Sequence, residues 1–304
     1  MKYAPIVLFV YKRPKETQKV LEALSANPEA AQSELFVYAD GPKNEADREK
    51  CLEVRRLVEN CHGFAKVTIH AAEKNKGLAN SVMSGVSEML AIFDRVIVLE
   101  DDLVASKYFL RFMNEALDKF ENDDNICSIH AFSYPPACPE VQYFLRRGAD
   151  CWGWATWRRG WKLFSSDSRK LHEEIVKRKL SKLFDRDGAF PYTKMLKDQA
   201  DGKIDSWAIR WYASAFLAEK YTLQSNVMLV KNIGWGNEAT HCSSHKQNYE
   251  IILSDTPVLF DHTAEVEPAE SVKIYRHYLQ MDKIPFLTRC MIKVKKIIKR
   301  LLRR

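Results

Sequence analysis

Three consecutive carboxylates, Glu100, Asp101 and Asp102, directly follow the apolar run 95–99. Adjacent carboxylates repel one another, so grouping them after a buried strand is costly unless a cation or hydrogen bonds compensate. Carboxylate oxygens suit Mg²⁺ and Mn²⁺, and Mg²⁺ is commonly held by one or two carboxylates together with substrate phosphates. The triplet therefore predicts a divalent-cation site. The alternative is that Asp101 and Asp102 cap a helix that begins near Ser106.

Two further polar segments follow apolar runs. Asp40 begins the turn Asp40-Gly41-Pro42, where its carboxylate would reach a base or a ribose, although an ordinary Asp-Gly turn also explains it. The segment Asn75-Lys76-Gly77-Leu78-Ala79-Asn80-Ser81 offers N–H groups at a helix start and a lysine for a bound phosphate. It lacks the spacing and the Gly-Lys-Ser/Thr ending of a P-loop, so a short basic loop is the alternative.

The elements that would position these side chains are short apolar runs that alternate with helical patterns. Strands are predicted at 6–11, 35–39, 66–71 and 95–99, and helices at 15–24, 44–59 and 78–93. Strands that are apolar on both faces predict an α/β fold, with a mostly parallel sheet covered by helices on both faces. In such sheets ligands bind at the carboxyl ends of the strands, which is where Asp40 and the acidic triplet fall.

The net charge is concentrated at one end of the chain. The 304 residues carry 47 Lys+Arg and 40 Asp+Glu, for a formal charge of +7. Residues 289–304 hold eight basic residues and no acidic one, so residues 1–288 have a net charge of −1. A nucleic-acid partner is therefore disfavoured. Apolar residues recur at helical spacing over 287–302, which predicts a basic amphipathic helix on an anionic membrane surface; a solvated helix that packs on the domain or on a partner is the alternative.

Cysteine use and hydropathy bear on the compartment. Seven cysteines without a C-x-x-C pair argue against a disulfide framework or a zinc ribbon and are typical of a reducing compartment. The apolar run 5–11 ends in Lys12-Arg13-Pro14 without a small-residue cleavage site, which favours a buried strand over a signal peptide. No run reaches the ~18 apolar residues that cross a bilayer. We expect a protein that is soluble or lies on a membrane surface.

Taken in order, Val7–Arg13, Asp40-Gly41, Lys76–Asn80 and Leu99–Leu103 resemble the motifs of a GT-A nucleotide-sugar glycosyltransferase. The sequence Leu-Glu-Asp-Asp-Leu is most similar to the acidic motif of the N-acetylglucosaminyltransferase I type, with similarity also to bacterial family 2 glycosyltransferases. The resemblance covers residues 4–245, and its flanking turns are less specific than the acidic motif.

The resemblance implies roles for the residues of the first half. Asp102 would bind Mn²⁺ or Mg²⁺ on the donor diphosphate, and Asp101 and Glu100 would contact the ribose or the donor sugar. The remaining implied donor-binding residues of this half are Arg13 and Asp40, which would hold the uridine, and Lys76 and Asn80.

The resemblance also implies sites in the second half. An inverting transfer needs a carboxylate that takes the proton of the acceptor hydroxyl, and the family's base corresponds to Asp205. An N-cap of the following helix is the alternative for Asp205, and Asp201 is the rival base. The segment 148–157 corresponds to the one that lines the donor sugar, with Asp150, Trp152 and Gly153 as site members, although most of the tryptophans would be core. A late histidine of the metal shell corresponds to His241, with His245 as a rival and a surface role as the alternative.

These observations predict a metal-dependent, inverting glycosyltransferase that moves a sugar from a nucleoside diphosphate, preferably UDP, to a cell-surface glycan or lipid-linked acceptor. We expect residues 1–125 to form the nucleotide-sugar-binding half, 126–285 the acceptor and catalytic half of the same GT-A domain, and 286–304 a membrane-associating tail. The protein would be cytoplasmic and peripheral on the inner face of the cell membrane, and would serve polysaccharide biosynthesis. The alternatives are a sugar nucleotidyltransferase and a non-catalytic, membrane-associated glycan-binding module.

Overall fold

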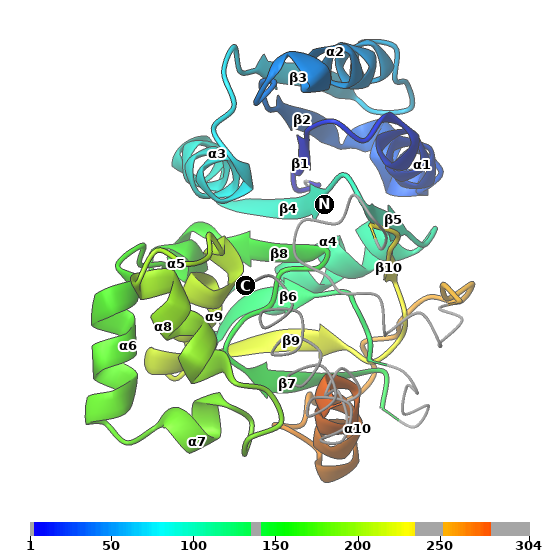
Figure 1. Cartoon of the computed structure of the whole chain (residues 1–304). Helices are drawn as coiled ribbons and strands as arrows, with labels where there is room; N and C mark the ends of the chain where they lie inside the picture. Colours follow the sequence, from blue (N-terminus) through cyan, green and yellow to red (C-terminus); the bar gives the residue numbers. More distant parts are fainter. Residues whose placement is uncertain (1–2, 135–140, 235–251, 281–304) are drawn as a thin grey trace, which may run out of the picture.

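The computed structural model describes residues 3–134, 141–234 and 252–280. An eight-stranded sheet runs through the described part of the chain (Figure 1). In spatial order its strands are β3 (Lys66–Ala71), β2 (Glu34–Ala39), β1 (Ile6–Val10), β4 (Arg95–Glu100), β8 (Trp154–Trp157), β6 (Ile126–His130), β9 (Tyr221–Ser225) and β7 (Tyr143–Arg147). Four neighbouring pairs are parallel and three, involving β8 and β7, are antiparallel. The predicted α/β fold with a mostly parallel sheet is confirmed.

Helices cover both faces of this sheet. Successive residues of a strand point to opposite faces, so a strand that is apolar throughout has two apolar faces to bury. Ile6 and Leu8 of β1 share an apolar core with α1 (Pro14–Ser25), α2 (Glu45–Glu59) and α4 (Phe109–Lys119). Val7 and Phe9 share a second core with α3 (Leu78–Ile92), α5 (Arg158–Trp161) and α9 (Trp207–Leu217). The strands and helices of the first hundred residues lie where the sequence pattern predicts them, within a residue or two at each end.

The other elements surround this framework. They are the 3₁₀ turn η1 (Pro28–Gln32) and the helices α6 (Ser168–Lys177), α7 (Ser181–Phe184), α8 (Tyr192–Ala200) and α10 (Ala269–Gln280). A short antiparallel ladder joins β5 (Leu103–Ala105) to β10 (Val230–Asn232). Because β8 pairs with β4, the first and second parts of the chain contribute to one sheet.

Tryptophans from the second part of the chain pack together against the sheet. The rings of Trp154 and Trp207 lie 5.4 Å apart, and those of Trp161 and Trp211 lie 5.2 Å apart. All four are buried in the core that contains α3 and α9. These four residues are therefore part of the core, as we expected for most of the tryptophans.

Two of the sequence predictions concern segments that the structure does not describe. The basic amphipathic helix over 286–304 lies outside the described residues, and so do His241 and His245. Within the described ranges, no helix combines the length and the apolar character needed to span a bilayer.

Candidate functional site

The acidic triplet lies at the carboxyl end of β4, beside the end of β1. Glu100 is the last residue of β4 and stands in register with Phe9 of β1. Beyond β1, the backbone N–H of Tyr11 donates to Asp101 Oδ2 at 3.2 Å. Arg13 Nη1 lies 2.7 Å from Asp102 Oδ2 and 3.4 Å from Asp101 Oδ1. The fold thus brings Arg13 together with the carboxylates, from segments 88 and 89 residues apart in sequence.

The alternative that Asp101 and Asp102 cap a helix is wrong. The strand β5 follows the triplet directly, and α4 begins only at Phe109. The N-cap of α4 is Tyr108, whose side chain makes no capping hydrogen bond. The aspartates are therefore available for a role other than helix capping.

Burial raises the pKa of the triplet. Loss of hydration, followed by repulsion from Asp102 and Asp101, raises the pKa of Glu100 to about 8, although a hydrogen bond from Trp207 opposes this. Burial and the charge of Asp102 raise the pKa of Asp101 to about 7. Burial also raises the pKa of Asp102, against the opposing charge of Arg13. Raised pKa values mean that the triplet is only partly ionised near neutral pH, so a further cation that binds here would displace protons from these carboxyl groups.

The carboxylates of the triplet can hold a divalent cation only if the substrate supplies some of the cation's ligands. Among the described residues, no three side chains of His, Cys, Asp or Glu converge to form a metal site. Mg²⁺ does not need such a cage, because it commonly keeps several waters and uses one or two carboxylates with substrate phosphates. Asp102 with a bound diphosphate meets this requirement, and Asp101 is the neighbouring carboxylate.

The backbone at Gly234 lies close to the side chain of Asp102. After β10 the backbone N–H of Ile233 donates to the Asp102 carbonyl at 2.8 Å. A Cβ added to Gly234 would lie 2.0 Å from Asp102 Oδ2, so only glycine leaves room for the carboxylate in this position.

The carboxylate of Asp40 has several protein partners. Its Oδ1 accepts hydrogen bonds from the backbone N–H groups of Gly41 and Lys76, both at 2.8 Å. Its Oδ2 accepts from Gly77 N and Asn75 Nδ2, both at 3.0 Å. These four hydrogen bonds engage both carboxylate oxygens, and a contact of Asp40 with a base or ribose stays a prediction. Asp40 positions the loop that leads into α3.

Lys76 and Asn80 lie on this positioned loop and on the first turn of α3. The side chain of Asn80 donates to the Lys76 carbonyl at 2.9 Å, and both residues are exposed. Gly77 precedes α3 with φ of +79°, a conformation that suits glycine. The lysine side chain is therefore presented to solvent at a helix N-terminus, and it makes no contact with the acidic triplet in the described residues.

Asp150 is also used inside the protein. Arg146 Nη2 donates to its Oδ2 at 2.6 Å, and the hydroxyl of Tyr134 donates to the same oxygen at 2.5 Å. Burial opposes ionisation, but His130, Arg146 and these hydrogen bonds hold the pKa of Asp150 below its usual range. Asp150 thus forms an internal ion pair that ties β6, β7 and the segment before β8 together, and its contact with a donor sugar stays a prediction.

Trp152 and Gly153 belong to the segment that leads into β8. The Trp152 ring packs edge-on against Phe132 at 4.7 Å between ring centroids. Gly153 has φ of +62°, and a Cβ there would lie 2.6 Å from a methyl carbon of Val230 in β10. Glycine is therefore required for packing against the β5–β10 ladder that follows Asp102.

Asp205 lies just before α9 and is not its N-cap. The cap is Ser206, whose side chain accepts a hydrogen bond from Ile209 N. The Asp205 side chain is 61% exposed and lies 3.2 Å from Arg210 Nη2. Its rival Asp201 pairs with Lys197 and Lys203. The carboxylate of Asp205 therefore faces solvent. Asp205 lies two residues before Trp207, whose side chain hydrogen-bonds Glu100.

Three residues at this site were not predicted from the sequence. The backbone N–H of Tyr11 donates to Asp101, and the indole N–H of Trp207 donates to Glu100. Gly234 has no side chain and so leaves room for the carboxylate of Asp102. Of these three, Trp207 lies two positions after the predicted base Asp205.

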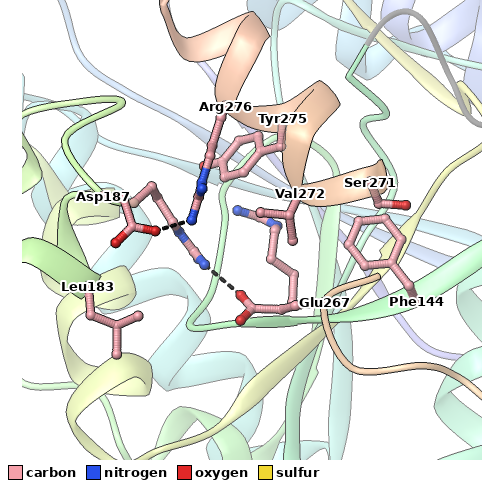
Figure 2. A pocket seen from close by; sticks show the side chains of 10 residues that line it. Phe144, Leu183, Asp187, Glu267, Ser271, Val272, Tyr275 and Arg276 are labelled. Atoms are coloured by element: carbon pink, nitrogen blue, oxygen red, sulfur yellow. Dashed lines mark hydrogen bonds and ion pairs between the residues drawn. The ribbon is translucent and has the colours of Figure 1, made fainter. Parts of the chain in front are cut away.

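Two hollows differ in their relation to this site. An enclosed cavity of about 40 Å³ lies between β7, residues 183–187 and α10, and is framed by the ion pairs of Arg186 with Glu267 and of Arg276 with Asp187 (Figure 2). It has room for a few water molecules and not for a nucleotide. A wider, open groove of about 620 Å³ runs between α1 and the β5–β10 ladder, and no residue of the acidic triplet lines it.

No protein-family model matches the chain, and no curated protein sequence matches it. Solved structures that resemble it include a cytidylyltransferase from Leptospira borgpetersenii serovar Hardjo-bovis (strain JB197), with 10% identity, a TM-score of 0.32, and coverage of 54% of this chain and 64% of that one. An active-site mutant of LgtC has 12% identity and a TM-score of 0.34, over 57% of this chain and 64% of its own. UDP-glucose pyrophosphorylase complexed with UDP-glucose has 12% identity and a TM-score of 0.37, over 75% of this chain and 91% of its own.

The match thus spans a little under two thirds of the cytidylyltransferase and of LgtC. One of the three is a cytidylyltransferase by name, and the pyrophosphorylase structure contains UDP-glucose. With TM-scores of 0.32 to 0.37 and identities of 10 to 12%, these likenesses assign no activity to this chain.

Proposed function

We propose that this protein is a metal-dependent GT-A glycosyltransferase, of the inverting type, that uses a UDP-sugar. The observation that carries the proposal is the partly buried Glu100–Asp102 triplet at the carboxyl end of β4, with Arg13 against Asp102. A crevice at this edge of an α/β sheet is where nucleotides bind. Three adjacent carboxyl groups at this edge support a site for Mn²⁺ or Mg²⁺ shared with a diphosphate.

In this proposal the residues of the chain have separate tasks. Asp102 holds the metal ion, whose chemistry is to neutralise the charge that develops on the departing diphosphate. The loop fixed by Asp40 presents Lys76 and the N-terminus of α3 to the phosphates. Asp205 accepts the proton of the acceptor hydroxyl, for which its solvent-facing carboxylate is suited.

The acceptor is proposed to be a cell-surface glycan or a lipid-linked saccharide. The open groove between α1 and the β5–β10 ladder combines apolar residues with Lys19, Glu22 and Lys231, a lining that suits an amphipathic chain. We further propose that residues 286–304 bind an anionic membrane and keep the enzyme on the cytoplasmic face. Deletion of 286–304 should abolish flotation with phosphatidylglycerol vesicles and leave soluble turnover intact; unchanged flotation would contradict the tail assignment.

Calorimetry with UDP, with and without Mn²⁺, tests the core of the proposal. UDP should bind the wild-type protein in a Mn²⁺-dependent manner, and Asp102→Asn should abolish this dependence. Asp94→Asn is the matched control, because Asp94 lies just before β4 at the opposite end of the strand and is 82% exposed. Equal Mn²⁺-dependent UDP binding by wild type and Asp102→Asn would refute the assignment.

The same experiment with other ligands tests the alternatives. A sugar nucleotidyltransferase would bind UTP and release pyrophosphate from UTP and a sugar phosphate. A glycan-binding module would bind saccharide without any nucleotide. Turnover of a UDP-sugar by the wild-type protein, together with its loss in Asp205→Asn at unchanged UDP affinity, would separate the proposed enzyme from both. Asp201→Asn is the control for Asp205, and loss of turnover in that variant alone would transfer the base role to Asp201.

A further inference from the structure

Arg13 lies where a cation on Asp102 would lie. Its Nη1 is 2.7 Å from Asp102 Oδ2 and 3.4 Å from Asp101 Oδ1, and its side chain is only 15% exposed. The guanidinium of Arg13 therefore supplies, from within the protein, the positive charge beside this pair of carboxylates. Arginine pairs with both carboxylate and phosphate oxygens, so a nucleoside diphosphate offers it an alternative partner.

The backbone of Arg13 is fixed, so a change of partner would involve its side chain. Pro14 restricts the conformation of the preceding residue and occupies the first turn of α1. The Arg13 carbonyl accepts a hydrogen bond from Thr17 N at 2.9 Å, as the first bond of that helix. Rotation about the side-chain bonds can therefore move the guanidinium while the site remains in place.

Asp102 Oδ2 cannot easily hold Arg13 and a metal ion together. Gly234 approaches this oxygen so closely that a Cβ there would lie at 2.0 Å, which closes one side of the carboxylate. Mg²⁺ binds carboxylate oxygens at about 2.0–2.1 Å, so it would lie within a few ångströms of a guanidinium bound to the same oxygen. Two cations at that separation repel each other strongly in a partly buried site.

We propose that Arg13 acts as an internal counter-ion that competes with the divalent cation for Asp102 and is released to the phosphates of the nucleotide. This inference rests on the proposed metal and nucleotide site, and concerns how that site is regulated. In the absence of nucleotide Arg13 keeps metal affinity low, and nucleotide and metal then bind with positive coupling. Because coupling is reciprocal, Mn²⁺ strengthens UDP binding by the same factor by which UDP strengthens Mn²⁺ binding.

The test measures Mn²⁺ binding alone, by electron paramagnetic resonance of free Mn²⁺, and UDP binding by calorimetry. In Arg13→Gln, Mn²⁺ alone should bind at least about tenfold tighter than in wild type, and the coupling factor with UDP should fall by a similar amount. Arg13→Lys keeps the charge without the planar fork and should lie between the two. Lys12→Gln is the matched control, because Lys12 pairs with Asp47 and not with the triplet, and it should change Mn²⁺ affinity less than twofold.

The outcomes separate the inference from the proposed function. If wild type and Arg13→Gln bind Mn²⁺ alone equally, while UDP binding stays Mn²⁺-dependent in wild type, the inference is refuted and the proposed function stands. If wild type shows no Mn²⁺-dependent UDP binding, the proposed function fails, and the inference fails with it. If Lys12→Gln tightens Mn²⁺ binding as much as Arg13→Gln does, the effect is one of general charge and the inference is also refuted.

Discussion

Replacing Asp40 with asparagine tests whether this residue positions a loop or contacts a ligand. The carboxylate accepts hydrogen bonds from Gly41 N, Lys76 N, Gly77 N and Asn75 Nδ2. An asparagine side chain offers one acceptor oxygen, so at best the two donors on one oxygen are kept and the two on the other are lost. Hydrogen bonds to a charged group contribute about 1.5–3 kcal/mol each, so two lost bonds correspond to about 3–6 kcal/mol.

Removing the buried charge recovers part of that cost, so we expect Asp40→Asn to lower the free energy of unfolding by about 3 kcal/mol. The assay is urea denaturation followed by circular dichroism. Asn75→Ala is the matched control, because it removes the side chain that bridges Asp40 Oδ2 and the Gly41 carbonyl, and it should cost about 1–2 kcal/mol. UDP affinity should fall along with stability, because the loop before α3 loses its position.

One pattern of results would refute this reasoning. If Asp40→Asn loses UDP affinity but less than about 1 kcal/mol of stability, the four hydrogen bonds do not hold the loop and the carboxylate contacts the nucleotide directly.

Three other changes have expected outcomes. Gly234→Ala should weaken Mn²⁺-dependent UDP binding at least about tenfold in calorimetry, because its Cβ would displace the Asp102 carboxylate; unchanged affinity would contradict the close approach. Burial lowers the pKa of His130 in the folded protein, so on acidification this imidazole is protonated more readily in the unfolded state. The free energy of unfolding should therefore decrease as pH falls below about 6.5, by up to about 1.4 kcal/mol per pH unit. His130→Gln should flatten this slope in urea titrations at several pH values, whereas the exposed His62→Gln should leave it unchanged; equal slopes would remove His130 as the cause. Ser206→Ala should cost about 0.5–2 kcal/mol of stability as the loss of an N-cap, and a cost near zero would show that the cap of α9 is dispensable.

The main elements of the fold could be predicted because they depend on local patterns. Buried strands such as 6–10 and 95–100 are apolar on both faces, and the helices between them have an apolar stripe, so their types and positions follow from periodicity. The position of the acidic triplet also follows, because a charged run after a buried strand must lie at its end.

The roles of individual site residues could be predicted less well. Asp40 and Asp150 were expected to contact the donor, and the sequence did not indicate the protein partners that both of them have in the structure. The partner of Asp40 is a loop about 35 residues further along the chain. Asp205 and Ser206 are both good N-caps by residue type, and only the geometry of the turn selects Ser206.

The α/β class, the placement of Glu100–Asp102 at the carboxyl end of a strand and the uneven distribution of charge all follow from local sequence patterns. Which groups face those carboxylates depends on the folded structure. Arg13 reaches Asp102 across 89 positions, and Gly234 approaches the same side chain from beyond β10. Periodicity depends on neighbours in sequence, whereas an ion pair or a close backbone approach depends on which strand ends meet when the sheet forms. The chemistry of the candidate site therefore depends on the packing of segments that are distant in the sequence.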